Sequence, residues 1–182
     1  MSVNFGEITQ TNNEDSFRIS VVLKEGQLGR SWKQAGVTSE FLGEILATHG
    51  AKSNLDYSEG RHAIIYLVNE LLENAIKFSL SGDIEIRCSL ERSSFEVAVI
   101  NMINPETLTE FQALLEELTT QDPGDLLIER IEANAADESS SGSGLGILTL
   151  MNDYGVRMGW HFSDLRSGNG VVLRTNASLT LN

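Results

Sequence analysis

Three polar residues at helical spacing have the chemistry of a magnesium and phosphate site. Glu70, Asn74 and Lys77 lie in YLVNELLENAIKFS, residues 66–79, and on a helix this spacing places them along one face. The amide oxygen of Asn74 suits Mg²⁺, Glu70 can orient or deprotonate an attacking group, and Lys77 can reach a phosphate. The alternative is the solvated face of an amphipathic helix, on which Lys77 offsets Glu73.

A glycine-rich stretch further along the chain is a candidate phosphate loop. In SSSGSGLGILTLMNDYG, residues 139–155, Gly142, Gly144 and Gly146 alternate with other residues. Glycine lets backbone amides approach an anion, and the N-terminus of a following helix adds a favourable dipole. A flexible linker would look similar up to Gly144, but the apolar continuation from Leu145 favours a loop that opens a helix. We therefore predict cofactor contacts at all three glycines and Leu145.

The elements that must position these two stretches follow from hydrophobic periodicity. Alternating patterns predict strands at 17–21, 84–90, 95–99, 156–162 and 171–175, and helical spacing predicts helices at 39–49, 58–78, 105–118, 126–133 and 144–154. Asn104 before Pro105 is typical of a helix cap. Because strands and helices alternate in blocks, we expect an α+β fold, a two-layer sandwich with a mixed, mostly antiparallel sheet covered on one face by helices.

Length and charge limit the classes of function. The 182 residues suffice for one domain, assigned to residues 16–182 after a loose or edge segment at 1–15. The net charge of −13 argues against nucleic acid or an anionic membrane as a partner, because both would repel the protein. The single cysteine, Cys88, has no internal disulfide partner, and the polar start lacks the apolar run of a signal peptide. We therefore expect a cytoplasmic location.

With both stretches in hand, the chain resembles the GHKL superfamily of gyrase, histidine-kinase and mismatch-repair ATPases. ELLENAIKF, from Glu70, is similar to its N box, and GSGLGI, from Gly142, is similar to its G2 box. The resemblance covers roughly residues 16–177 and is closest to the branch of anti-sigma factors and serine-protein kinases. It implies a Bergerat-type sandwich that binds ATP or ADP with Mg²⁺, with Glu70 as general base and Asn74 as metal ligand.

One motif of that family is degenerate in this sequence. Where the family carries DxGxG, whose aspartate accepts from the adenine amino group, the chain continues from Asn101 without either glycine. An asparagine oxygen still accepts a hydrogen bond, but its amide adds donors that weaken base selectivity. Asn104 is the alternative base-binding residue. Val171 and Val172 stand where a threonine often follows the family's glycine, here Gly170.

The resemblance implies a regulatory switch that binds ATP or ADP and phosphorylates or docks a small antagonist-type, STAS-like protein. Its activity would be that of a Mg-ATP-dependent serine/threonine kinase, with residues from Ala135 to Ser143 as a lid. The alternative is a non-catalytic interaction module whose adenine pocket has decayed and which needs no nucleotide. Simple ATP hydrolysis is a third hypothesis, and a homodimer is left open.

Overall fold

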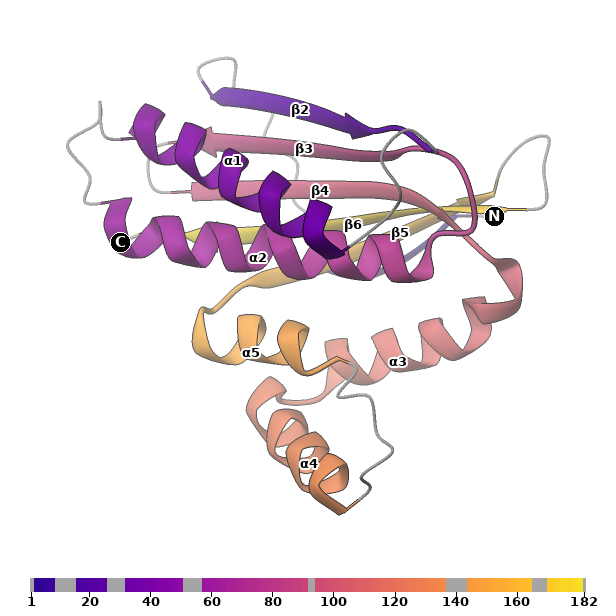
Figure 1. Ribbon diagram of the computed structural model, residues 1–182. Coiled ribbons are helices and arrows are strands. Elements are labelled where there is room, and N and C mark those ends of the chain that lie inside the picture. The colour runs from indigo at the N-terminus through magenta and orange to yellow at the C-terminus, as the bar shows by residue number, and fades with distance from the viewer. Residues whose placement is uncertain are drawn as a thin grey trace.

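A six-stranded sheet forms the centre of the computed structural model, which describes residues 2–8, 16–25, 32–50, 57–91, 94–136, 144–164 and 170–181. The strand order is β1-β5-β6-β4-β3-β2 (Figure 1). The strands are β1 (Ser2–Gly6), β2 (Phe17–Leu23), β3 (Ile84–Glu91), β4 (Ser94–Ile103), β5 (Arg157–Asp164) and β6 (Val171–Thr180).

Every neighbouring pair of these described strands is antiparallel, so the expectation of a mixed sheet was wrong in that detail. The pairing of Leu23, the last residue of β2, with Ile84, the first residue of β3, explains why these two strands are antiparallel. Two helices separate these strands and return the chain to the end of the sheet that it had just left. The sheet is therefore antiparallel throughout, and the predicted α+β class is confirmed.

The helices lie together against the sheet, and α4 extends furthest from it (Figure 1). They are α1 (Trp32–Gly50), α2 (Tyr57–Phe78), the short 3₁₀ helix η2 (Pro105–Thr107), α3 (Leu108–Thr120), α4 (Pro123–Ala136) and α5 (Leu145–Asp153). Helix α1 begins earlier than its periodicity predicts. Helix α4 continues through Asn134 and Ala135, which were expected in a polar loop or lid, and residues 137–143 of that lid lie outside the described part of the chain. No described helix is long and apolar enough to cross a lipid bilayer.

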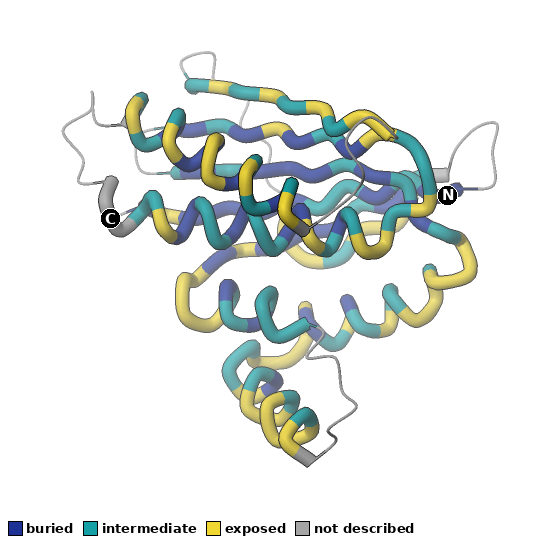
Figure 2. The backbone as a smooth tube through the Cα atoms, viewed as in Figure 1, coloured by how far each residue is buried: buried dark blue, intermediate teal, exposed yellow. Residues whose placement is uncertain are grey.

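One core lies between the sheet and its helices, and it includes buried residues of all five described α-helices. Ile84, Ile86 and Cys88 alternate with more exposed neighbours along β3, as predicted, and are at most 3% exposed. Fully buried Leu67 and Leu72 of α2 join the same core. Figure 2 shows the result: buried positions alternate with less buried ones along β3, β4 is mostly buried, and α1 has an exposed outer side.

The N-terminal residues add an edge strand to this sheet. Strand β1 pairs with β5, which agrees with the edge alternative for residues 1–15; residues 9–15 lie outside the description. A Cβ on Gly159 would lie 2.2 Å from the carbonyl oxygen of Glu7. Glycine at this position therefore lets the chain leaving β1 pass directly against β5.

Candidate functional site

A pocket of about 260 Å³ lies among η2, the helices α2, α3, α4 and α5, and three strands of the sheet, β4, β5 and β6. This volume is slightly below the range for small-molecule sites, roughly 300–1,000 Å³. Most of its surface is apolar, supplied by Leu71, Ala75, Phe78, Phe111, Leu114, Leu115, Leu118, Ile147, Trp160 and Leu173. The remaining polar lining residues therefore decide which ligands the pocket can select.

Three of the predicted site residues, distant in sequence, line this one pocket. Asn74 comes from α2, Asn101 from β4, and Gly144 from the turn that begins α5. Gly144 has φ +92°, a left-handed conformation that favours glycine, and its carbonyl accepts from the amide of Leu148 at 3.3 Å. The prediction that a glycine turn opens a helix here is thus confirmed, whereas phosphate binding by this turn stays a prediction, and Gly142 lies outside the described residues.

Two other candidates, Lys77 and Leu145, are not among the described residues that line the pocket. Lys77 is exposed, its Nζ lies 5.2 Å from the centre of the Phe78 ring, and it is not among the described residues that line the pocket. The pocket face of α2 consists of Leu71, Ala75 and Phe78, with Asn74 at its edge. Lys77 lies about 60° around the helix axis from Asn74, on the side away from that face. Leu145 is the first residue of α5 and is half-buried next to Gly144.

Asn101 is the most informative polar residue of the site. It is 4% exposed, and its Nδ2 has no hydrogen-bond partner within the described protein. A buried donor without a partner is costly and calls for an explanation such as a bound ligand. Asn104, the alternative base-binding residue, is instead used structurally: its Oδ1 accepts from the backbone amide of Glu106 at 3.0 Å and caps η2.

Glu70 lies against the first turn of α5. A Cβ on Gly146 would lie 1.9 Å from Oε2 of Glu70, so the missing side chain makes the space that this carboxylate occupies. Burial, and secondarily the charge of Glu73, raise the pKa of Glu70 above its ordinary value of 4.5. Neither Glu70 nor Gly146 is among the described residues that line the pocket, so the carboxylate lies beside the start of α5 and not in the pocket lining. A carboxylate with a raised pKa can accept a proton, which is the role that the resemblance implies for Glu70, and that role stays a prediction.

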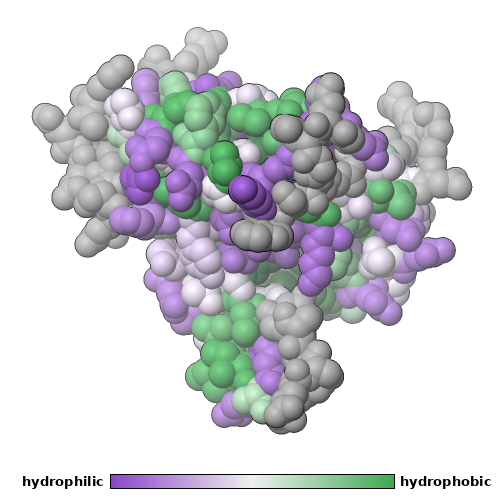
Figure 3. All heavy atoms as spheres, in the orientation of Figure 1, coloured by the Kyte–Doolittle hydropathy of each residue, from purple (hydrophilic) through white to green (hydrophobic). Residues whose placement is uncertain are grey.

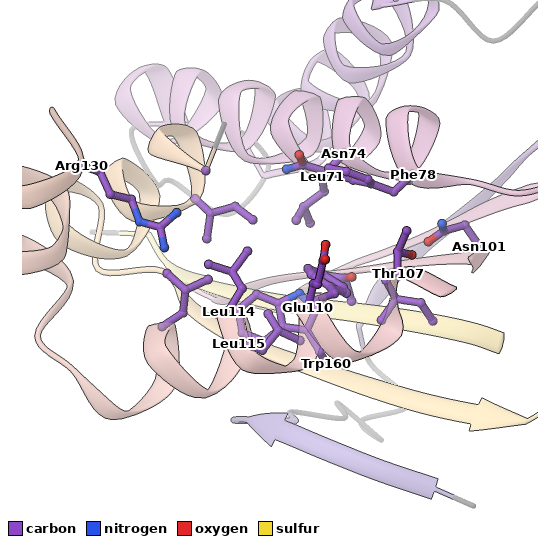
Figure 4. Close-up of a pocket in the computed structure, with 17 residues that line it drawn as sticks. Leu71, Asn74, Phe78, Asn101, Thr107, Glu110, Leu114, Leu115, Arg130 and Trp160 are labelled. Atoms are coloured by element: carbon purple, nitrogen blue, oxygen red, sulfur yellow. The ribbon is translucent and has the colours of Figure 1, made fainter. Parts of the chain in front are cut away.

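Four polar lining residues were not predicted from the sequence: Thr107, Glu110, Arg130 and Thr175. Figure 4 shows Asn101 and Arg130 at opposite ends of the pocket, with Asn74 above and Glu110 below. Thr175 comes to the pocket because β6 pairs it with Val99 and β5 pairs it with Trp160. The missed residues lie on η2, α3, α4 and β6, and no motif marks them; only the packing of these elements reveals them.

The arrangement suits an elongated ligand with a flat apolar part and an anionic end. The apolar lining can enclose a ring, Asn101 supplies a donor at one end, and Gly144 with Arg130 supplies positive potential at the other. Within the described ranges, no three His, Cys, Asp or Glu side chains are grouped to hold a metal. The donor set still fits Mg²⁺, because this ion usually keeps several waters and takes one or two protein oxygens together with phosphate.

Comparison with known proteins gives a likeness of fold, but none of sequence. No protein-family model and no curated protein matches the sequence. A chain in the crystal structure of the SiaB–SiaC complex from Pseudomonas aeruginosa has a similar fold, with a TM-score of 0.62 and 10% sequence identity. The match covers 87% of this chain and 89% of that chain. At this identity the likeness establishes a shared α+β fold.

Proposed function

We propose that the protein is a nucleotide-binding regulatory switch of the GHKL type, which binds ATP or ADP with Mg²⁺ and phosphorylates or docks a small regulatory protein. The observation that carries the proposal is the meeting of Asn74, Asn101 and Gly144 on one pocket. These residues come from the three motif positions that the resemblance associates with metal, base and phosphate. The fold neighbour was solved in a complex of two proteins, which supports a protein partner.

In this proposal the base lies at the Asn101 end of the pocket. Oδ1 of Asn101 accepts from an exocyclic amino group, and the unpartnered Nδ2 donates to a ring nitrogen, a bidentate pairing that asparagine makes with adenine. Phe111 and Leu173 supply apolar surface beside the ring. The phosphates then extend toward Gly144 and the N-terminus of α5.

Phosphoryl transfer would need Glu70 as the proton acceptor. The partner's serine oxygen forms a bond to the γ-phosphorus, the bond to the β–γ bridging oxygen breaks, ADP leaves, and the serine proton passes to Glu70. Mg²⁺, when bound, neutralises charge on the phosphates, and Asn74 is the residue that would hold it. The raised pKa of Glu70 makes it a better base than an ordinary surface carboxylate.

The second candidate function is a binding module that no longer needs nucleotide. It is favoured by the apolar character of the pocket and by the direct passage from β4 into the cap at Asn104, without the family's glycines. Helix α4 carries exposed Ile128 and Ile131, 58% and 51% exposed, which offer apolar surface for a protein partner. Figure 3 shows hydrophobic side chains gathered over α4.

Calorimetric titration with ADP and ATP, with and without Mg²⁺, tests the proposal. We expect binding by the wild type, a magnesium-dependent gain in ATP affinity, and loss of that gain in Asn74→Ala. Asn69→Ala is the matched control, because Asn69 is on the same helix but its side chain donates to Glu73 at 2.8 Å. Absence of binding at millimolar nucleotide would reject the switch in favour of the binding module. Magnesium-dependent ATP binding that survives in Asn74→Ala would reject Asn74 as the metal ligand.

A further inference from the structure

Arg130 reaches the pocket from a helix that no motif connects with nucleotide binding. It belongs to α4, lines the pocket, and is the one lysine or arginine among the described lining residues. Its Nη1 lies 3.1 Å from the position that a Cβ would take on Gly144. In Figure 4 the guanidinium points into the pocket near the start of α5. The cation therefore lies beside the turn whose backbone is the candidate phosphate loop.

The same guanidinium is already paired with a carboxylate from another helix. Nη2 of Arg130 donates to Oε2 of Glu117 on α3 at 2.9 Å. The arginine side chain is 24% exposed and the glutamate side chain 37% exposed, so water screens the pair only partly. Glu117 is not itself among the described residues that line the pocket. A ligand anion and Glu117 would thus compete for one cation.

We propose that Arg130 is the anion-binding side chain of this pocket, that it binds the terminal phosphate of the nucleotide, and that Glu117 competes with the ligand for it. The inference rests on the proposed function and deepens it. Arginine suits this role because its planar fork binds phosphate oxygens in pairs. Lys77, the cation that helical spacing suggested, lies over the Phe78 ring and outside the pocket lining.

Competition with Glu117 gives the inference a signature that a structural ion pair lacks. If the ion pair only holds α3 to α4, removing either partner should lower both the stability of the fold and the affinity for any ligand. If Arg130 is shared, removing Arg130 weakens phosphate binding, whereas removing the charge of Glu117 frees the guanidinium and strengthens it. The two variants should therefore change affinity in opposite directions.

The experiment compares Arg130→Gln and Glu117→Gln with the wild type by calorimetry, using ADP, adenosine and inorganic pyrophosphate. For Arg130→Gln we expect ADP to bind about 10- to 100-fold more weakly, because a charge-assisted hydrogen bond to the phosphate is lost. The affinity for adenosine, which has no phosphate, should not change. For Glu117→Gln we expect the ADP affinity to rise by up to about fivefold, which corresponds to the free energy of a partly exposed ion pair. Thermal melts of each variant without ligand confirm that it is folded.

Each result bears on a defined claim. Unchanged ADP affinity in Arg130→Gln, or equal losses for ADP and adenosine, would overturn the assignment, as would weaker ADP binding in Glu117→Gln. If the wild type binds neither ADP nor adenosine, the nucleotide function fails, and pyrophosphate then decides the anion site alone. If the wild type binds pyrophosphate and Arg130→Gln does not, Arg130 remains an anion-binding residue. If the wild type does not bind pyrophosphate, the assignment of Arg130 to anion binding is wrong.

Discussion

At the scale of single residues, the site is defined by polar groups whose surroundings cost stability. Asn101 has a buried amide nitrogen with no partner within the described protein, and Glu70 holds a carboxylate partly out of water beside Gly146. Neither arrangement is explained by packing, because an apolar side chain would fill either place at lower cost. Such groups are typical of functional sites, where a ligand supplies what the fold leaves unsatisfied.

Replacing Asn101 by leucine should therefore raise stability and remove ligand binding together. Asn101→Leu eliminates a buried unpaired donor, and we expect the free energy of unfolding to rise by about 1 kcal/mol in urea denaturation. Its thermal shift with ADP should disappear. Ser178→Ala is the control: its buried hydroxyl also lacks a partner in the described protein, but it lies outside the pocket lining, so its ADP response should persist. An undiminished shift in Asn101→Leu would exclude Asn101 from base binding.

The raised pKa of Glu70 predicts a pH-dependent penalty. The folded protein holds this proton more tightly than the unfolded chain, so the contribution of Glu70 to stability falls as pH rises above its ordinary value of 4.5. We expect Glu70→Gln to have a higher melting temperature than the wild type at about pH 7 and no advantage at about pH 4. Glu40→Gln, the same substitution at an exposed position of α1, is the matched control. A constant effect of Glu70→Gln with pH would contradict this account.

At the scale of elements, close helix packing sets where α2 presents its polar face. A Cβ on Gly43 of α1 would lie 2.3 Å from Cγ1 of Ile65 on α2, so the two helices touch through this glycine. Helix α2 also ends against the sheet, where Ser79 bridges to Ile103 and the amide of Leu80 donates to the carbonyl of Met102 at 2.8 Å. Helix α2 is therefore packed against α1 at Gly43 and fixed to β4 at its C-terminal end. Asn74 lies on this helix and lines the pocket together with Asn101 of β4.

Two glycines of α1 provide a matched test of that contact. Gly36→Ala meets no atom within 4 Å and should raise the free energy of unfolding by about 0.5–1 kcal/mol through helix propensity. Gly43→Ala gains the same propensity but forces Ile65 or the helix itself to move, and we expect a net loss of about 1–3 kcal/mol. Urea denaturation of both variants measures the difference. Equal stabilisation by the two substitutions would show that the helices do not rely on Gly43.

At the scale of the whole molecule, one core joins the sheet to its helices, and Cys88 lies inside it. The residue is 3% exposed, and burial raises the pKa of its thiol to about 12. The reactive thiolate is therefore scarce in the folded protein at neutral pH. Because Cys88 is the sole cysteine of the chain, a thiol reagent reports on the opening of the central sheet.

Alkylation of Cys88 by iodoacetamide should accordingly follow global unfolding. We expect negligible labelling of the native protein over the time in which the urea-unfolded chain is fully modified, measured by mass spectrometry. If ADP binds the folded state alone, a concentration about 100 times its dissociation constant should slow labelling about 100-fold. Asn101→Leu should lose this protection. Rapid labelling of the native wild type would show that the sheet opens locally at β3.

Much of this molecule follows from short-range patterns in the chain. The alternation that buries Ile86 and Cys88, the apolar stripe of α2 and the cap at Asn104 are local features, and the structure confirms each of them. The pocket also receives Asn74 and Gly144 from the two stretches that their composition singled out. Local periodicity and turn chemistry act over a few residues, so they can be recognised in the sequence alone.

Only the folded chain reveals which groups share the pocket. Arg130 and Thr175 reach it through the packing of α4 and the register of β6. Lys77 lies outside it because the pocket meets the other side of Asn74, the side of α2 that carries Ala75 and Phe78. The antiparallel pairing of every described strand likewise depends on contacts between segments far apart in the sequence. A side chain's identity sets what it can bind, but its neighbours across the fold set its burial, its partner and its direction, and no window along the chain contains those neighbours.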